Sequence, residues 1–276
     1  MLIKEEKLAH WIDNFYGYGT WDSRVWFVAY EEDGGEVPGD VADRVDFFSS
    51  SNQISAPTLC DIREVYRAIT YRSETSKTDL FPNRYEYRFG PGAGLSNVWK
   101  NLIAFEFGFR NEVAPDFLFY QRNILAAAEH GNEALVKLYP LPGPRSHAWY
   151  YAWLETPGIE FLKSRSLYEQ ALFNKRMEVI LSNVEKYKPQ LVLMYGMTNI
   201  NSLKEKIVKW AGTGEFKMIK GTKLEVPQHH RIDLEGTIIV ITTQFPALRH
   251  NRPETGFNWY DFGRRVAGSR HHHQIK

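Results

Sequence analysis

The sequence predicts an α/β domain of three layers, in which helices cover both faces of a central four-stranded parallel sheet. Two observations predict this fold class. Short apolar segments alternate with longer segments of helical periodicity, and none of the apolar segments shows the apolar–polar alternation of a half-exposed strand. The chain of 276 residues is long enough for one substantial core, so we expect a single domain over residues 1–267 and a polar C-terminal tail over 268–276.

Four segments of the chain are predicted to be the buried strands. Each is short, rich in branched or aromatic residues, and bounded by glycine, proline or charged residues, which is typical of strands inside a sheet. In chain order they are residues 24–30, 134–139, 190–195 and 237–242. Because the connections between them are long enough to contain helices, we expect parallel strands with right-handed crossovers.

Segments of helical periodicity fill the connections and predict the two outer layers. The predicted helices are residues 58–70, 95–107, 114–130, 166–187, 200–210 and 259–266. Residues 216–234 are polar and β-like with a turn at Gly221, so we expect a small hairpin beside the main sheet. The sequence contains no internal repeat and no linker that would divide it into two domains.

Charge and cysteine content limit the classes of function. The chain has 34 basic and 33 acidic residues, so any contact with nucleic acid must come from a local patch of charge. The only cysteine, Cys60, excludes a disulfide within the chain and favours a reducing cytoplasm. No stretch approaches the ~20 apolar residues of a membrane span, so we expect no membrane partner, and the sequence identifies no protein partner.

The first predicted strand ends in an acidic turn. Tyr30, Glu31, Glu32, Asp33 and Gly34 follow one another there, and ligands of open parallel sheets bind beyond the carboxyl ends of the strands. Carboxylates that crowd together raise one another's pKa, and glycine lets the backbone approach a ligand closely. The turn is therefore a candidate site, although a solvated acidic turn would have the same sequence.

Two other strand ends carry proline-containing loops with basic residues. After the second strand, three prolines between Tyr139 and Arg145 fix an extended loop, which is either a rigid connector or part of a site. After the fourth strand, residues 244–251 contain a proline followed by Arg249 and His250. This second pattern suits a loop that contacts phosphate.

The four strand-end segments, taken in order, resemble the motifs of the uracil-DNA glycosylase superfamily. The closest branch has Gly-Glu-Ala-Pro-Gly after the first strand, which residues 30–34 resemble with the glutamate kept. Residues 138–145 resemble the Pro-Pro-Gly-x-Arg loop of that branch, and residues 188–196 resemble its Lys-Pro-x-apolar-Gly strand. Residues 244–249 resemble its His-Pro-Ala-x-Leu-x-Arg loop, so the resemblance extends over residues 24–251.

The resemblance implies a DNA N-glycosylase on a uracil-DNA glycosylase-like fold. In that superfamily a nucleotide is flipped out of DNA, and a carboxylate or amide after the first strand orients the water that releases the base. The implied catalytic residue is Glu31, with Glu32 and His250 as further candidates. The implied substrate-binding residues are Tyr30, Gly34, Tyr139, Gln244 and Phe245, and the implied contacts to DNA phosphates are Arg145, Arg249 and Arg252.

One departure from the family motif concerns catalysis. Phe245 stands where the family has a histidine that donates a hydrogen bond to the departing base, and phenylalanine cannot donate. The loss of such a donor typically costs about 10²-fold or more in rate. Gln244 and His250 are the remaining candidates for this role.

Other departures concern base recognition and cofactors. Tyr30 replaces a family glycine and either stacks on a base or fills the pocket, while the asparagine that reads the base has no clear counterpart. The closest branch binds an iron–sulfur cluster through four cysteines, which Cys60 alone cannot supply, so we expect no cofactor. A metal site at His229 and His230 is not expected, because neighbouring strand residues point to opposite faces.

The aromatic run over residues 147–153 has two interpretations. It contains five ring-bearing residues in seven positions. Exposed rings would form a stacking surface for unpaired bases, whereas buried rings would belong to the core. The sequence favours the core.

Three hypotheses of function follow. The first is a base-flipping DNA-repair hydrolase that cleaves the N-glycosidic bond of uracil or another altered base, with Glu31 activating water. The second is a non-catalytic protein on the same fold that binds single- or double-stranded nucleic acid or a nucleotide, because fold does not fix function. The third is another hydrolase that uses the acidic turn on a different ligand.

Overall fold

A computed structural model gives the fold and describes residues 3–32, 38–50, 56–70, 81–143, 149–221, 226–247 and 258–268. The protein has an α/β architecture built on one eight-stranded sheet, with strand order β3-β1-β4-β2-β5-β8-β7-β6. The strands are β1 (Phe15–Tyr18), β2 (Val25–Ala29), β3 (Thr58–Cys60), β4 (Glu133–Lys137), β5 (Leu191–Tyr195), β6 (Lys217–Ile219), β7 (His229–Asp233) and β8 (Ile238–Ile241).

The four predicted strands form the centre of this sheet. They correspond to β2, β4, β5 and β8, which are neighbours in the order β4-β2-β5-β8 and are parallel to one another. Every residue of these four strands is buried, because helices cover both faces of the sheet.

The prediction of a sheet with only four parallel strands is wrong, because the sheet is larger and mixed. On one side, β1 pairs antiparallel with β4 and parallel with β3. On the other side, β7 pairs antiparallel with β8 and β6 with β7, so the predicted hairpin extends the main sheet. Strand β1 could not be recognised from the sequence, because this strand is short and contains Gly17, whose φ is +129°. A Cβ at this glycine would overlap the carbonyl oxygen of Leu135 in β4.

Nine α-helices and two short 3₁₀ helices surround the sheet in the described part of the chain. They are α1 (Glu5–Asn14), α2 (Pro38–Ser50), α3 (Ile62–Ala68), α4 (Arg84–Arg88), α5 (Asn97–Arg110), α6 (Phe117–Asn123), η1 (Tyr150–Trp153), η2 (Glu160–Lys163), α7 (Arg165–Tyr187), α8 (Ile200–Ala211) and α9 (Trp259–Gly268). Each of these helices is too short or too polar to span a bilayer.

Two predicted helices differ from the observed ones. The segment 58–70 begins as strand β3, and α3 starts only after Asp61, whose side chain accepts a hydrogen bond from the backbone N–H of Arg63. The segment 114–130 contains only the short helix α6, and Ala126, three residues past its end, has a left-handed φ of 48°. Local capping and turn geometry therefore decided these boundaries rather than apolar periodicity.

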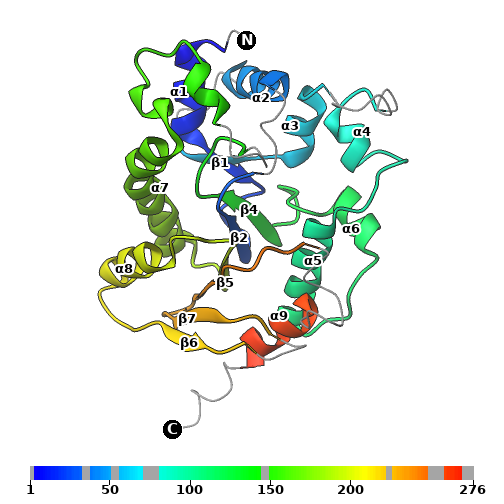
Figure 1. Cartoon of the computed structure of the whole chain (residues 1–276). Coiled ribbons are helices and arrows are strands. Elements are labelled where there is room, and N and C mark those ends of the chain that lie inside the picture. Colours follow the sequence, from blue (N-terminus) through cyan, green and yellow to red (C-terminus); the bar gives the residue numbers. More distant parts are fainter. Residues whose placement is uncertain are drawn as a thin grey trace.

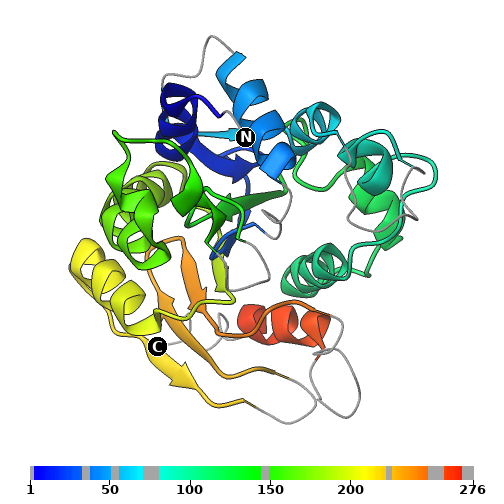
Figure 2. The same ribbon diagram turned by 45° about the horizontal axis from the view of Figure 1, so that its top comes forward.

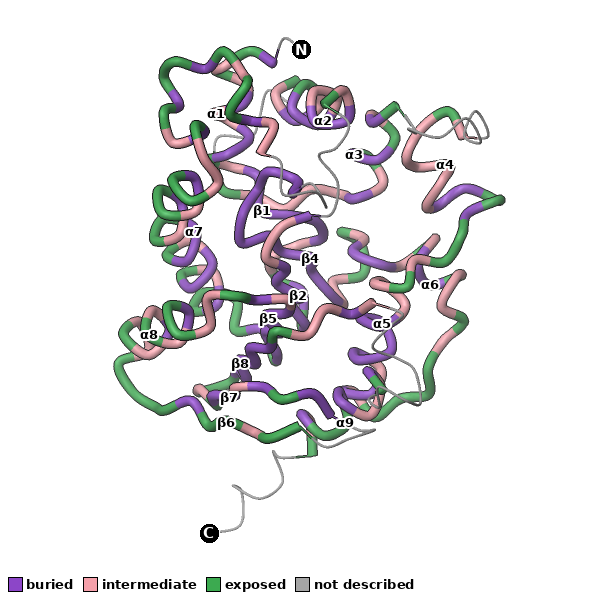
Figure 3. Tube along the Cα trace, viewed as in Figure 1, coloured by how far each residue is buried: buried purple, intermediate pink, exposed green. Residues whose placement is uncertain are grey.

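Helices lie on both faces of the sheet. Figure 1 shows α7 and α8 on one face and α5, α6 and α9 on the other, and Figure 2 shows the same arrangement with the top of the molecule turned forward. The burial pattern in Figure 3 agrees, since the central strands are buried while the helices are exposed on their outer sides. The three predicted layers are therefore present around a sheet larger than expected.

A buried arginine fixes α7 against the sheet. The side chain of Arg176 is 1% exposed, and it donates hydrogen bonds to the backbone oxygens of Phe15, Lys137 and Leu138 at 2.8, 2.8 and 3.0 Å. These bonds join α7 to β1 and β4. The middle of α7 is thereby held against the end of β4.

The strand order identifies where a ligand would bind. From β2 the chain crosses to β4 on one side, and from β5 it crosses to β8 on the other side. In open α/β sheets, ligands bind outside the carboxyl ends of strands at such a reversal. The residues that follow β2 and β5 are therefore the first to consider.

Candidate functional site

Backbone hydrogen bonds place the residues after β2 beside the residues after β4. Tyr139 donates its N–H to the carbonyl oxygen of Tyr30, and Gly143 donates to that of Glu32, each at 2.9 Å. The two chain segments thus stay together beyond the ends of their strands, with Glu31 between the two bonds. Three predicted site residues, Tyr30, Glu31 and Tyr139, consequently lie at one place.

Glu31 points toward the first residue of α7. Its Oε1 accepts an ion-paired hydrogen bond from Nη2 of Arg165, which lies 134 residues away in the sequence. The side chain of Glu31 is 20% exposed. Gly143 lies directly against this carboxylate, because a Cβ at position 143 would overlap Oε1. The carboxylate is therefore fixed in position and still reachable by solvent.

Glu32 has a different environment. It is 7% exposed and accepts hydrogen bonds from Nη1 of Arg44 at 2.7 Å, from the Tyr18 hydroxyl at 2.7 Å and from the Tyr66 hydroxyl at 3.0 Å. Burial acts to raise the pKa of Glu32, but the charges of Arg44 and Lys137 and the Tyr18 hydrogen bond lower it to about 2. These contacts join the end of β2 to β1, α2 and α3.

The expectation that the crowded carboxylates raise one another's pKa is wrong for Glu32. The cations beside the acidic turn come from two helices, one 12 residues and the other 134 residues along the chain, and neither was singled out from the sequence pattern. Arg44 lies on α2 and pairs with Glu32, while Arg165 lies on α7 and pairs with Glu31. Between the two carboxylates, Glu31 is the one placed for chemistry, and Glu32 is enclosed in a structural network.

Aromatic rings gather at the same strand ends. The rings of Tyr30 and Tyr139 lie 4.9 Å apart between centroids, and those of Tyr195 and Phe245 lie 5.8 Å apart. Burial raises the pKa of Tyr30 and Tyr139, and the negative charge of Glu169 adds to the increase for both phenols. Both phenols therefore stay neutral at physiological pH and keep their donor hydrogens.

Backbone contacts fix the loop after β8 against the end of β5. Gly196 has a φ of +66° and donates its N–H to the carbonyl oxygen of Gln244 at 3.0 Å. The amide of Asn101 donates to the carbonyl oxygen of Pro246 at 3.1 Å. A Cβ at position 196 would lie only 3.1 Å from the Phe245 ring. Gln244 and Phe245 therefore lie beside the end of β5, as predicted for a shared edge.

Five predicted site residues lie outside the described residues. They are Gly34, Arg145, Arg249, His250 and Arg252. Their assignments as substrate, phosphate and catalytic contacts remain predictions.

Sequence reasoning missed Arg44 and Arg165. One signal was present for Arg165: it is the first residue of α7, directly after the capping residue Ser164, where a positive charge is unfavourable to the helix dipole. A cation at such a position indicates a partner elsewhere in the fold. Arg44 gave no comparable signal, since arginines on helices are usually solvated.

The described residues contain no group of three or more side chains suited to hold a metal ion. His229 is 3% exposed, and its Nδ1 lies 2.9 Å from the carbonyl oxygen of Pro227. Burial lowers the pKa of both His229 and His230. The two histidines are adjacent on strand β7 and differ in burial, in agreement with opposite faces.

The aromatic run divides between core and surface within its described part. Tyr151 is 4% exposed, whereas Trp153 is 75% exposed. The Tyr151 hydroxyl donates to the carbonyl oxygen of Pro142 at 2.9 Å, and the ring of Trp149 lies 5.0 Å from that of Tyr168. The preference for core is confirmed for Tyr151, but it fails for Trp153.

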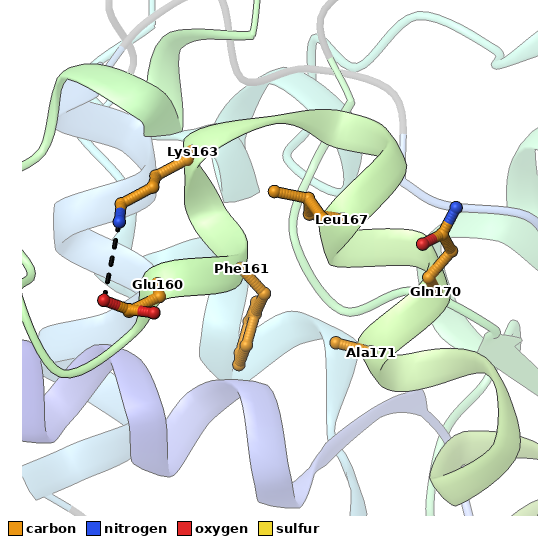
Figure 4. Close-up of a pocket in the computed structure, with 6 residues that line it drawn as sticks. All are labelled: Glu160, Phe161, Lys163, Leu167, Gln170 and Ala171. Atoms are coloured by element: carbon orange, nitrogen blue, oxygen red, sulfur yellow. Dashed lines mark hydrogen bonds and ion pairs between the residues drawn. The ribbon is translucent and has the colours of Figure 1, made fainter.

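A surface hollow lies between η2 and the start of α7, and none of the predicted site residues lines it. Figure 4 shows its lining of Glu160, Phe161, Lys163, Leu167, Gln170 and Ala171. Its only charged groups, Glu160 and Lys163, pair with each other at 3.5 Å. The hollow has no convergent polar groups and suggests no chemistry.

Comparison of the chain with family models, with curated proteins and with solved structures gave no match. The assignment of function therefore rests on the geometry of the strand ends and on the short motifs that they carry.

Proposed function

We propose that the protein is a DNA N-glycosylase-like hydrolase that releases uracil or another altered base, and that its fold is of the uracil-DNA glycosylase type. The observation that carries this proposal is the position of Glu31. Its partly exposed carboxylate lies at the carboxyl end of β2, where the strand order reverses, and is fixed by Arg165 and Gly143. Glu32, next to it, is enclosed by Arg44 and two tyrosines.

The carboxylate of Glu31 suits hydrolysis of an N-glycosidic bond. As the water oxygen bonds to C1′ of the sugar, Glu31 accepts a proton from that water. The bond from C1′ to the base nitrogen breaks, and its electron pair leaves with the base. Positive charge that develops on the sugar is stabilised by the nearby negative carboxylate.

The charge balance at the strand ends is compatible with a polyanionic substrate. Glu31 and Glu32 are each paired with an arginine, and Lys137 also lowers the pKa of Glu32. Unpaired carboxylates would repel DNA phosphates, whereas these two glutamates each have an arginine beside them. DNA, single- or double-stranded, is therefore the proposed partner, and a cytoplasmic role in DNA repair belongs to the same proposal.

Two partly exposed rings at the strand ends, Tyr30 and Phe245, provide apolar and polarisable surface for a flipped base, and they pack on the buried rings of Tyr139 and Tyr195. Tyr30 and Tyr139 form one ring pair, and Tyr195 and Phe245 form another. Bases stack on such rings with little dependence on their identity. Within this proposal Gln244, beside the Phe245 ring, is one group that can donate a hydrogen bond to the base, and the hydroxyl of the partly exposed Tyr30 is another.

One observation favours a second candidate, a nucleic-acid or nucleotide-binding protein that does not cleave. Phe245 packs on Tyr195 and supplies no donor, and the ion pair with Arg165 makes Glu31 a weaker base. Both features are compatible with recognition of a base without hydrolysis. The two candidates share a fold and a binding surface and differ only in chemistry.

The test is release of free base from single- and double-stranded oligonucleotides that carry uracil, hypoxanthine, xanthine or an alkylated base. Enzyme should be in excess, so that one turnover is detectable. We expect release from at least one substrate. Salt-sensitive binding without any release would support the non-cleaving candidate instead.

A further inference from the structure

We infer that Arg165 is a positioning residue for Glu31, and that Arg165 and Gly143 together hold this carboxylate ionised and in one orientation. Arg165 acts on catalysis only through Glu31, so its catalytic role rests on the proposed function. The contacts that define this arrangement come from three segments: the turn after β2, the loop after β4 and the start of α7.

The positive charge of Arg165 lies at an unfavourable position, and its hydrogen-bond partners compensate for it. It is the first residue of α7, whose first turn contains no acidic residue, and the partial positive charge of a helix N-terminus disfavours a cation. Its guanidinium donates from Nη2 to Glu31 and from Nε to Glu169, the latter at 3.1 Å. Partial burial acts to lower the pKa of Arg165, but its attraction to Glu31 raises it overall.

The guanidinium is also held from a third side. Its Cζ lies 5.9 Å from the ring of Trp149, so that Glu31, Glu169 and an aromatic face together fix its orientation. An exposed arginine with one partner would sample many rotamers. Three contacts on one planar group leave far fewer rotamers, and a guanidinium with one orientation can position Glu31.

Gly143 forms the opposite wall. It is buried, and a Cβ at this position would clash with both carboxylate oxygens of Glu31. The Gly143 N–H is bonded to the carbonyl oxygen of Glu32, so the loop cannot easily move aside. Any larger residue at position 143 would therefore displace the carboxylate of Glu31.

The Glu31 side chain is only 20% exposed, and two buried tyrosines lie within reach of its charge. Burial raises the pKa of Tyr151 and Tyr168, and the negative charge of Glu31 adds to the increase for both phenols. A carboxylate in such surroundings is charged at low cost only beside a cation. Removal of the Arg165 charge should therefore favour protonation of Glu31.

The test is a ¹³C NMR titration of the glutamate carboxyl groups, with Glu31 assigned through Glu31→Gln. We expect Arg165→Gln to raise the measured pKa of Glu31 by at least about one unit, and Arg165→Lys to restore much of the difference. Lys163→Gln is the matched control, because Lys163 forms an exposed ion pair just before α7. An unchanged Glu31 pKa in Arg165→Gln would overturn the inference.

The pH dependence of base release gives a second readout. In Arg165→Gln the acid limb of the pH–rate profile should move to higher pH by as much as the measured pKa of Glu31 rises, with little change in KM. If the wild-type protein releases no base while the titration still shows the expected shift, the proposed function fails and the arrangement around Glu31 stands. If base release is normal and the titration shows no shift, the proposed function stands and the inference about Arg165 fails.

Discussion

Two pairs of glutamates lie at opposite ends of the sheet and are stabilised in different ways. At the carboxyl end, Glu31 and Glu32 separate and each forms an ion pair with its own arginine. At the amino end, Glu106 of α5 and Glu133, the first residue of β4, are 1% and 2% exposed. Tyr120 and the backbone N–H of Ala126 donate to Glu133 at 2.8 and 2.7 Å.

The pair at the amino end has less positive charge available. Arg110 reaches Glu106 at 3.4 Å and also pairs with the exposed Glu112, and Oε2 of Glu106 has no hydrogen-bond partner among the described residues. Burial and the neighbouring Glu133 raise the pKa of Glu106 well above its ordinary value, and burial also raises that of Glu133. We expect this pair to retain a proton at neutral pH.

The comparison shows that burial alone does not determine the charge of a carboxyl group. Glu32 and Glu106 are both buried, at 7% and 1% exposed, yet the pKa of Glu32 is lowered to about 2 while that of Glu106 is raised. The difference lies in the cations within reach. At the carboxyl end each glutamate has an arginine close by, whereas at the amino end burial outweighs the single Arg110 and raises the pKa of both glutamates.

The largest expected effect is the removal of the buried cation at Glu32. Arg44→Met should lower the free energy of unfolding by about 3–5 kcal/mol, because it leaves a buried charge without its partner. Urea unfolding at pH 7 measures the change. The double variant Arg44→Met/Glu32→Leu should recover part of the loss, and a single variant as stable as the wild type would contradict the account of this network.

A smaller effect is expected from Glu106→Gln, and it depends on pH. Because the folded-state pKa of Glu106 is raised, its contribution to stability is complete below the unfolded pKa of about 4.3 and is lost as pH rises toward the folded value. The wild-type free energy of unfolding should therefore fall by up to about 1.4 kcal/mol per pH unit from this group alone.

Glu106→Gln should flatten this dependence between about pH 5 and pH 8, as measured by urea unfolding at each pH. Glu178→Gln is the control, because its side chain is 68% exposed and pairs only with Lys206 among the ion pairs described. Equal slopes for the wild type and Glu106→Gln would show that the pair at the amino end is not protonated as inferred.

The smallest effect on stability is expected at Gly143. Gly143→Ala should cost about 1–3 kcal/mol through overpacking, yet reduce base release at least about tenfold, since the carboxylate of Glu31 must move. Gly94→Ala is the matched control, because a Cβ there meets nothing within 4 Å. Full activity in Gly143→Ala would refute the role of this glycine in holding Glu31.

The central strands could be predicted from the sequence because burial on both faces makes them apolar throughout. Among the outer strands, β6 and β7 were predicted as a hairpin but not as part of the main sheet. Strand β1, which contains Gly17, was not predicted, because it depends on pairing with strands already in place. Strand β3 begins a segment whose periodicity favoured a helix. Tertiary pairing decided β1 and β3, and local propensity gave little information.

The candidate site was predictable where neighbouring parallel strands end at one edge. This rule alone is enough to place Tyr30, Glu31 and Tyr139 together, and their contacts confirm it. It could not reveal the arginines, because Arg165 comes from a helix 134 residues beyond Glu31. Charged residues that become partners only when the helices pack on the sheet do not form a short motif in the sequence.

The central claim is that Glu31, and not Glu32, is the reacting carboxylate. The most direct test compares single-turnover base release by wild type, Glu31→Gln and Glu32→Gln on the best substrate, with each rate normalised to folded protein. The account predicts that Glu31→Gln lowers the rate by at least about 10²-fold with its fold intact, while Glu32→Gln mainly loses stability. A fully active Glu31→Gln, or loss of activity confined to Glu32→Gln, would contradict it.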